Sequence, residues 1–321
     1  FLPKKGDRMA TSTPAATTAA KANASDVPQS SWAKSRERLA WLLVLPSLLV
    51  VVLVAIYPLF QAFRLSLTNA RLGSTRPTEY VGFENYRYIF NDQSFINSIW
   101  HTVYFTVASV AAETVLGMCI ALIIHSNFKG RGIIRTSMLV PWAIPTVVSA
   151  QIWKWMLQDQ YGVINDILVN RLHILDHKVA WIANPKTAMP SMIAVDVWKT
   201  TPFMALLLLA GLQVIPGDVY EAARVDGASK WKQFWQITLP LLRPALLVAL
   251  IFRTLDAFRV FDVIYVMKGY AAETLTVSMY ARQMMIDLSR LGRGSAASVV
   301  IFLCIGVMVL GYTRLVKVEE I

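Results

Sequence analysis

The chain has 321 residues, of which 55% are hydrophobic and 16% charged, and its mean hydropathy is +0.48. This composition is too apolar for an ordinary water-soluble domain and indicates an integral membrane protein. Lys and Arg number 31 against 20 Asp and Glu, a net charge of +11. Multi-pass membrane proteins carry such a surplus in cytoplasmic loops near anionic headgroups. Because no basic stripe alternates with exposed aromatic residues, nucleic acid is not an expected partner.

Cysteine and histidine positions do not indicate a metal site or a disulfide framework. Cys119 and Cys304 both lie inside long apolar runs. His173 and His177 have the spacing of one helix face, but no third ligand lies near them in the sequence. We therefore expect no metal and no catalytic residue in this chain.

The amino-terminal residues 1–35 are expected to be a disordered cytoplasmic tail, because residues 10–31 are small and polar and show no apolar periodicity. This tail does not have the form of a signal peptide, since no short apolar core follows its basic residues at once. A single membrane domain is expected over residues 36–321.

Six apolar segments follow, each long enough at about 1.5 Å per residue to cross a hydrocarbon core of about 30 Å. The third contains Pro141 and Pro145 and is expected to be kinked, and the fourth and fifth contain charges that predict a pathway or ion pairs. The six expected spans are residues 40–60, 100–124, 133–156, 189–212, 243–266 and 296–316.

The distribution of Lys and Arg predicts the orientation of the chain. With both termini in the cytoplasm, sixteen of the 31 basic residues fall in cytoplasmic segments and eleven on the opposite side, while four lie within the spans. The bias is concentrated before the first span and in the short connection at 126–135, where the positive-inside rule has most weight.

The connection at 216–240 between the fourth and fifth spans is predicted to form a helix, a glycine turn and a second short helix. Asp218 is expected to cap the first helix with Glu221 three residues later, and Gly227 to end it. The second helix has one bulky apolar face made by Trp231, Phe234 and Trp235. From the residues alone, this could be an amphipathic helix on the membrane surface.

The same connection resembles the EAA loop of the membrane subunits of binding-protein-dependent ABC importers. Glu221-Ala222-Ala223 is followed after three residues by Gly227 and after nine more by Ile237-Thr238-Leu239-Pro240. The sequences at 197–216 and 245–267, and YVGFENYRYIF at 80–90, also resemble the maltose/trehalose branch of that family. Relatives often have a glycine-rich TGG where this chain has Lys268-Gly269-Tyr270. The coupling residues that the resemblance implies are Glu221, Ala222, Ala223, Asp226, Gly227, Ile237, Leu239 and Pro240.

The resemblance implies an all-α fold with six transmembrane helices, the type I ABC importer permease core and a cytoplasmic coupling helix that docks on an ATPase subunit. It implies a multi-pass protein of the cell inner or plasma membrane. The implied partners are a second homologous permease subunit, an ATP-binding subunit dimer and an extracytoplasmic sugar-binding protein. The chain itself should bind no cofactor, since ATP and Mg are used by the ATPase, and no GxxxxGK[ST] phosphate loop occurs in the sequence.

Charged residues within the last apolar segments are candidates for the substrate path. Arg253, Asp256, Arg259 and Asp262 alternate in sign at steps of three, which allows two interpretations: a structural ladder of ion pairs along one helix, or groups that face a watery cavity. In the second case Asp256 and Asp262 would accept hydrogen bonds from sugar hydroxyls.

The fourth segment offers a facing set, Asp196, Lys199 and Thr200, and we expect the helix to loosen at Thr200-Thr201-Pro202. Aromatic rings nearby could stack on a sugar, among them Phe203 and Phe261. The predicted substrate path comprises Asp196, Trp198, Lys199, Thr200, Arg253, Asp256, Phe258, Arg259, Asp262 and Tyr265.

The expected cargo is a di- or oligosaccharide, with a small α-glucoside such as trehalose or maltose favoured by the resemblance. Sucrose, glucosylglycerol and glycerol 3-phosphate are the alternatives. A secondary transporter is a further alternative, but it would lack the EAA pattern and usually show internal repeats.

Overall fold

The computed structural model describes residues 31–315, and over this range the chain is helical apart from its connections and one isolated antiparallel bridge between Thr68 and Tyr80. The predicted tail at 1–30 lies outside the described residues. Helix α1 begins at Ser31, so residues 31–35, expected in the tail, are helical. The described residues divide into two compact units, with the boundary between Pro58 and Leu59.

The first unit contains α1 (Ser31–Val51) and a π-helical turn (Val52–Ile56), and the helix continues into α2 (Tyr57–Ser66). The continuous helix Arg36–Ser66 has 31 residues, and none of its most apolar 18-residue window is buried. A run of Leu and Val without charges is stable in lipid without protein contacts on any side, so this exposure agrees with a membrane span.

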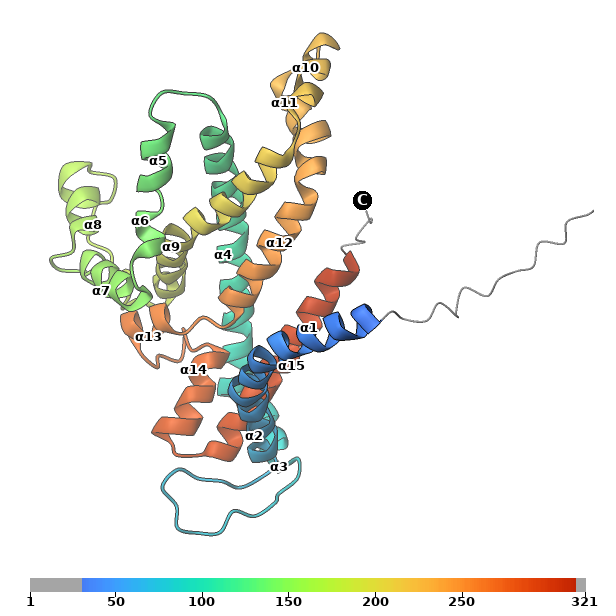
Figure 1. Ribbon diagram of the computed structural model, residues 1–321. Helices are drawn as coiled ribbons and strands as arrows, with labels where there is room; N and C mark the ends of the chain where they lie inside the picture. Colours follow the sequence, from blue (N-terminus) through green and yellow to red (C-terminus); the bar gives the residue numbers. More distant parts are fainter. Residues whose placement is uncertain (1–30, 316–321) are drawn as a thin grey trace, which may run out of the picture. The chain divides into compact units, whose positions relative to one another are not determined.

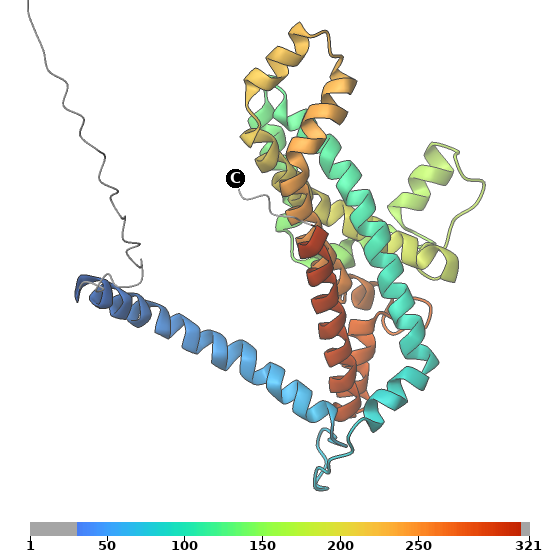
Figure 2. The ribbon, with the colours of Figure 1, turned by 90° about the vertical axis from the view of Figure 1, so that its right-hand side faces the viewer.

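The second unit contains four further helices that are long and apolar enough to cross a membrane (Figures 1 and 2). They are α4 (Gln93–His125), α9 (Pro185–Val214), the helical segment Lys230–Lys268 and α15 (Leu291–Leu315). The segment 230–268 comprises α11 (Lys230–Gln233), a π-helical stretch (Phe234–Thr238) and α12 (Leu239–Phe258), followed after a break at 259–261 by α13 (Asp262–Lys268). The shorter elements are α3 (Glu84–Asn91), α5 (Arg131–Ser137), α6 (Val140–Ala143), α7 (Thr146–Met156), α8 (Val163–Asn165), a π-helical stretch (Asp166–Arg171), α10 (Gly217–Val225), α14 (Val277–Arg282) and a π-helical stretch (Gln283–Asp287).

The segment expected to be a kinked third span is sharply broken. The stretch Arg131–Ala143 meets α7 at an angle of 91°. The two together make a sixth candidate membrane span if this bent pair is counted as one span. The break lies at Ile144, which has an extended backbone (ψ 132°) before Pro145. Steric contact with the proline ring disfavours the helical region for the residue before it, which explains the position of the break.

Helices α4, α9 and α12 pack together as the centre of the second unit. The side chains of these helices and of the elements packed against them form two apolar clusters at different heights. One contains Met118, Ile124, Met204, Leu208, Leu212, Leu242 and Ala249. The other contains Phe95, Phe105, Met192, Val195, Val260, Ile264 and Tyr280. Residues between these heights on the three helices are therefore surrounded by protein on both sides along the bundle.

Both connections expected in the cytoplasm lie toward the same end of this unit. The turn from α4 to α5 and the α10–α11 segment are at one end, and the α2–α3 connection is at the other (Figures 1 and 2). Helices α4 and α9 both terminate at the end that holds α10 and α11, and α12 begins there, so the stretch α5–α7 leads the chain away from it before α9 (Figure 1).

Candidate functional site

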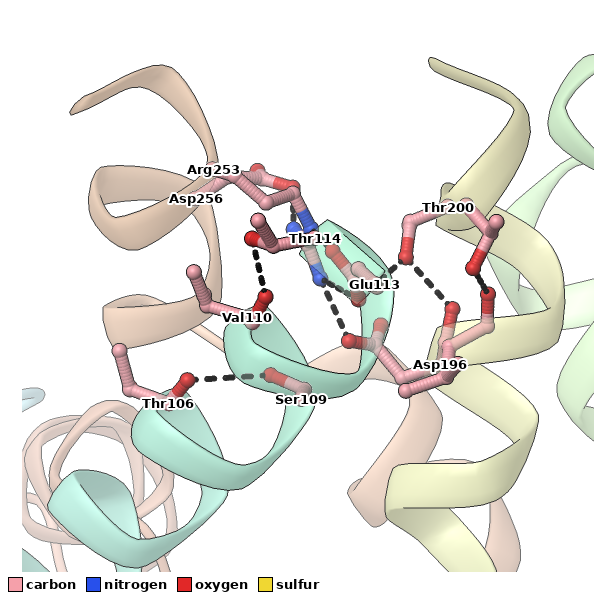
Figure 3. Close-up of polar contacts among 11 residues, drawn as sticks. Thr106, Ser109, Val110, Glu113, Thr114, Asp196, Thr200, Arg253 and Asp256 are labelled. Atoms are coloured by element: carbon pink, nitrogen blue, oxygen red, sulfur yellow. Dashed lines mark hydrogen bonds and ion pairs between the residues drawn. The ribbon is translucent and has the colours of Figure 1, made fainter. Parts of the chain in front are cut away.

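Three helices each contribute a charged side chain to one buried cluster between the two apolar clusters. Glu113 comes from α4, Asp196 from α9, and Arg253 and Asp256 from α12 (Figure 3). We call these four residues the Arg253 cluster. The side chains of Glu113 and Arg253 are 0% and 3% exposed, whereas that of Asp256 is 68% exposed. The cluster therefore has a buried part and one accessible carboxylate.

The Arg253 guanidinium is bonded to all three carboxylates. Its Nε and Nη2 both donate to Glu113, the second at 2.9 Å, and Nη2 also lies 2.6 Å from Asp196 Oδ2. Its Nη1 donates to Asp256 Oδ2 at 2.6 Å. The Thr200 hydroxyl donates to Glu113 Oε1 at 2.6 Å. Because a buried charge is costly without partners, these contacts hold α4, α9 and α12 in one arrangement.

A cavity of about 190 Å³ lies against the accessible side of this cluster. Polar and charged groups make up much of its wall, and an indole and a phenyl ring complete it. Its lining residues are Trp142, Thr146, Asp196, Lys199, Thr200, Arg253, Asp256, Ala257, Arg259, Val260, Phe261, Asp262 and Val263. Such a combination of hydrogen-bonding groups with flat apolar faces suits a polyhydroxylated ligand.

The structure brings seven of the ten predicted substrate-path residues to this cavity and places three elsewhere. Trp198 packs edge-on against Trp153, with ring centroids 5.3 Å apart. Phe258 lines a separate hollow beside Tyr312. Tyr265 stacks on Phe261 and lies under the Arg282 guanidinium. The seven that line the cavity are Asp196, Lys199, Thr200, Arg253, Asp256, Arg259 and Asp262.

The predicted ladder of ion pairs forms only at its first step. Arg253 and Asp256 are paired, but α12 ends at Phe258 and α13 begins at Asp262, so the helical spacing is lost. Neither Arg259 nor Asp262 forms an ion pair with another residue of the described range 31–315. The ladder is therefore wrong beyond Asp256, because the sequence pattern assumed one unbroken helix.

The predicted loosening at Thr200-Thr201-Pro202 is also wrong. Helix α9 runs without interruption from Pro185 to Val214 and contains Pro202 in its interior. The Thr201 hydroxyl donates to the carbonyl oxygen of Val197 at 2.6 Å, and the Thr200 hydroxyl, which also contacts Glu113, lies 2.6 Å from the carbonyl oxygen of Asp196. Contacts with α4 and α12 support the helix across the proline, as neighbouring helices do in membrane proteins.

Glu113, Trp142 and Thr146 belong to the site but were not predicted from the sequence. A signal for Glu113 exists, since it is the one acidic residue of the expected span 100–124. It also ends a buried polar stripe at helical spacing on α4, formed by Ser98, Thr102, Thr106, Ser109 and Glu113. No comparable pattern marks Trp142 or Thr146, because they reach the cavity through the break between α6 and α7.

The segment that joins α9 to α12 forms the predicted helix, turn and second helix. The residue that caps α10 is Pro216, and Asp218 lies in the first turn, so the expected capping box is wrong. Gly227 ends the helix with φ +75° as expected. The amides of Gly227 and Ala228 donate to the carbonyl oxygens of Arg224 and Ala223, which is a Schellman closure.

The second short helix begins after Ser229, whose hydroxyl accepts from the Lys232 amide. Trp231, Phe234 and Trp235 contact one another, with ring centroids 5.2 to 6.2 Å apart. The two halves of the segment are joined by a 3.0 Å hydrogen bond between the Tyr220 and Thr238 hydroxyls.

The residues matched to the EAA pattern lie on both halves of this segment. Glu221, Ala222, Asp226 and Gly227 are exposed, while Ala223 is buried. Glu221 makes one exposed ion pair, at 3.6 Å, with Arg224. Ile237, Leu239 and Pro240 are half-buried at the start of α12. The first helix thus presents a charged, accessible face at the end of the bundle.

No group of three or more His, Cys, Asp or Glu side chains within the described part of the chain is arranged to hold a metal ion. His173 and His177 lie in the connection before α9. Cys119 and Cys304 are unpaired.

The fold is that of the permeases of type I ABC importers. A bacterial ABC transporter that imports the acidic polysaccharide alginate matches with a TM-score of 0.78 over 90% of this chain and 99% of that chain, at 23% sequence identity. The helical bundle therefore has the fold of this class of multi-pass membrane proteins.

Sequence similarity identifies the family. The trehalose/maltose transport system permease protein of Thermococcus litoralis is 45% identical over 285 residues, which cover 87% of this chain and 93% of that protein. The sulfoquinovosyl glycerol transport system permease protein of Agrobacterium fabrum is 39% identical over 284 residues, which cover 88% of this chain and 91% of that protein. The chain belongs to the binding-protein-dependent transport system inner membrane components, whose family model matches residues 113–318.

Proposed function

We propose that this permease subunit forms half of the path for a di- or oligosaccharide of the α-glucoside type, such as trehalose or maltose. The observation that carries the proposal is the cavity beside the Arg253 cluster, where α9 and α12 supply carboxylates, a hydroxyl and an ammonium group within one enclosure. Sugar hydroxyls both donate and accept hydrogen bonds, so they can use all of these groups. Phe261 and Trp142 supply apolar faces for a pyranose ring.

The name of the Thermococcus litoralis relative, at 45% identity, supports trehalose and maltose as cargo. Glucosylglycerol is the second candidate, because the name of the Agrobacterium fabrum relative contains a glyceryl glycoside. That name gives no such support to glycerol 3-phosphate. A secondary transporter has no support from the family to which the chain belongs.

Energy for transport would come from a separate ATPase dimer that uses ATP and Mg. In the proposed mechanism α10 docks on the ATPase, with Glu221 as its charged contact, and the Schellman closure at Gly227 fixes the angle at which the second half returns to α12. Because Tyr220 and Thr238 link the two halves, a displacement of α10 would be passed to α12 and to Arg253.

The remaining partners in this proposal are a second permease subunit, which completes the path, and an extracytoplasmic sugar-binding protein, which delivers the cargo. The concentration of Lys and Arg before the first span and at 126–135 supports cytoplasmic termini in the inner or plasma membrane.

The proposal is tested by uptake into proteoliposomes that contain the complete transporter purified through a tag on this chain. Labelled trehalose and maltose, presented with the binding protein, should accumulate only when ATP is enclosed with the ATPase. A nucleotide-free preparation is the control. ATP-dependent accumulation of glycerol 3-phosphate without accumulation of either disaccharide would refute the α-glucoside assignment.

A further inference from the structure

The hydrogen-bonding capacity of Arg253 is almost fully used within the protein. A guanidinium has five N–H donors in a planar fork. Glu113 takes donors from Nε and Nη2, Asp196 takes one from Nη2, and Asp256 takes one from Nη1. Although Arg253 belongs to the cavity wall, its side chain is only 3% exposed. It therefore has little left to offer an anionic ligand.

The charges that remain accessible in the cavity are balanced. Asp256 and Asp262 are exposed carboxylates, and Arg259 is an exposed cation. Lys199 is half-buried in the same wall and has no ion-pair partner among the described residues. Where the Arg253 cluster meets the cavity, its accessible member is the Asp256 carboxylate, at 68% exposed. A ligand that approaches the buried guanidinium thus meets a negative charge first.

We propose that Glu113, acting through Arg253, is a specificity-determining residue that makes this cavity select neutral glycosides over anionic ones. This inference rests on the proposed function and adds the charge class of the cargo. Glu113 is a positioning residue: it is 0% exposed, and it fixes the guanidinium in the plane where Asp196 and Asp256 complete its shell. Its further contact with Thr200 fixes a hydroxyl of the same wall.

The physical basis is that like charges repel strongly where water is scarce. Unit charges about 4 Å apart interact by about 1 kcal/mol even in bulk water, and by more beside low-dielectric walls. A phosphate or carboxylate on the cargo would face Asp256 without gaining Arg253. Neutral hydroxyls lose nothing there, because they can donate to the carboxylate. The cavity should therefore disfavour glycerol 3-phosphate, which is anionic, and can still accept glucosylglycerol, which is neutral.

The test compares trehalose with its analogue in which one hydroxymethyl group is oxidised to a carboxylate. The assembled transporter is placed in lipid nanodiscs without the binding protein, so that the selectivity measured is that of the membrane cavity. Displacement of labelled trehalose gives an inhibition constant for each sugar. We expect wild-type protein to bind the carboxylate at least about fivefold more weakly than trehalose.

Two variants separate charge selection from stability. Asp256→Asn replaces an exposed carboxylate, and Glu113→Gln replaces the buried carboxylate. Each new side chain is an amide of the same shape as the carboxylate that it replaces. Each should lower the ratio of the carboxylate's inhibition constant to that of trehalose by about fivefold or more, because each removes one negative charge from a cluster whose three carboxylates outnumber its single guanidinium. If Glu113→Gln does not assemble, Asp256→Asn tests whether the negative charge of the Arg253 cluster sets the ratio, and an unchanged ratio in that variant overturns the proposal. Asp176→Asn, which removes an exposed carboxylate outside the cavity, should leave the ratio unchanged.

A ratio within twofold of wild type in both assembled variants, with trehalose still bound, would overturn the role of Glu113 and leave the proposed function standing. If wild-type protein bound the carboxylate analogue as tightly as trehalose, the role of Glu113 would likewise be overturned and the proposed function would stand. Failure of wild-type protein to bind or transport either disaccharide would instead overturn the proposed function and this inference together.

Discussion

Gly211 on α9 lies so close to Ala245 on α12 that a methyl group added at residue 211 would come within 2.4 Å of the Ala245 side chain. The same methyl group would lie 2.7 Å from Leu242 Cδ1. Small residues permit such close approach of helices in membranes, where packing replaces the hydrophobic effect as the main source of association. The contact brings α12 against α9 on the side of the cavity that faces the α10–α11 segment.

Gly211→Ala should therefore force α9 and α12 apart and lower the stability of the protein by about 1–3 kcal/mol, the usual cost of overpacking. The measurement is the melting temperature of the purified transporter, followed by size-exclusion chromatography of heated samples. Gly306→Ala on α15 is the matched control, because no atom lies within 4 Å of the added methyl group. Equal melting temperatures for the two variants would contradict the close approach.

Arg253→Met should destabilise the protein more than any change at the cavity rim. It leaves Glu113 and Asp196 buried without a cation, and loss of one partner of a buried ion pair costs about 3–5 kcal/mol. Arg253→Lys should recover only part of this loss, since an ammonium cannot reproduce the planar fork. Melting temperatures of the purified transporter check the order.

The double variant Arg253→Met with Glu113→Leu should melt at a higher temperature than Arg253→Met alone, because it removes the uncompensated carboxylate. Arg259→Lys is the control, being exposed and outside any ion pair of the described residues. A wild-type melting temperature for Arg253→Met would show that the cluster does not stabilise the bundle.

The sequence predicted which charged residues lie at the cavity better than it predicted the backbone that forms the cavity wall. Asp196 and Arg253 stand out because charges within apolar segments are rare, and their spans are adjacent to the EAA pattern. The break after Phe258 could not be predicted, because no proline or glycine lies between Asp256 and Asp262. The break follows from tertiary packing, which overrides local propensity.

Local signals were reliable only where one residue type determines the backbone. Gly227 adopts positive φ, and the residue before Pro145 leaves the helical region, both as the sequence requires. Asp218 and Pro202 show the limits of such signals. An acidic residue stabilises the first turn of a helix as well as its cap, and a proline can remain inside a helix that its neighbours support.

Lys268 and Glu273 form a contact that should make stability depend on pH. Lys268 Nζ lies 2.8 Å from Glu273 and donates to the carbonyl oxygens of Ile182 and Ala183. The hydrogen bond from Lys268 lowers the pKa of Glu273 below its ordinary value. A lowered pKa means that the contact stabilises the folded state above the ordinary carboxylate pKa, and that this stability is lost as pH falls through the lowered value.

Glu273→Gln should therefore lower the melting temperature slightly at pH 7, by the equivalent of about 1 kcal/mol or less for a partly exposed pair. The difference from wild type should shrink as pH falls below the ordinary carboxylate range and disappear below the lowered pKa of Glu273. Glu84→Gln, at an exposed carboxylate outside the ion pairs of the described residues, is the control. A difference that stays constant from pH 7 to pH 4 would assign the effect to packing instead of charge.

Glycine should be required at position 227 because of its backbone conformation, and not because a larger side chain would collide with its neighbours. Its φ is +75°, and no atom lies within 4 Å of an added Cβ. Gly227→Val should strain the turn by more than the roughly 1–2 kcal/mol that an L-residue loses in the left-handed region, whereas Gly227→Asn should be tolerated because Asn adopts that region readily. Sugar uptake into proteoliposomes should fall severalfold in the first variant and stay near wild type in the second. Equal losses in both would show that the side-chain volume matters at this position.

Glu221→Arg should uncouple ATP hydrolysis from transport if α10 is the contact with the ATPase. The Glu221 side chain is 72% exposed, so reversal of its charge leaves the fold of this chain intact and acts on a partner surface. Sugar-stimulated ATP hydrolysis and co-purification of the ATPase should both fall at least about tenfold, as expected for a charged contact worth 1.4 kcal/mol or more.

Arg224→Ala is the control for this variant, since it removes the ion pair of Glu221 with Arg224 and leaves the carboxylate in place. An exposed pair three residues apart on a helix contributes at most about 0.5 kcal/mol, so coupling in this control should be close to wild type. If Arg224→Ala reproduced the loss, the Glu221 effect would be internal to α10. If Glu221→Arg kept both hydrolysis and co-purification, Glu221 would not be a contact with the ATPase.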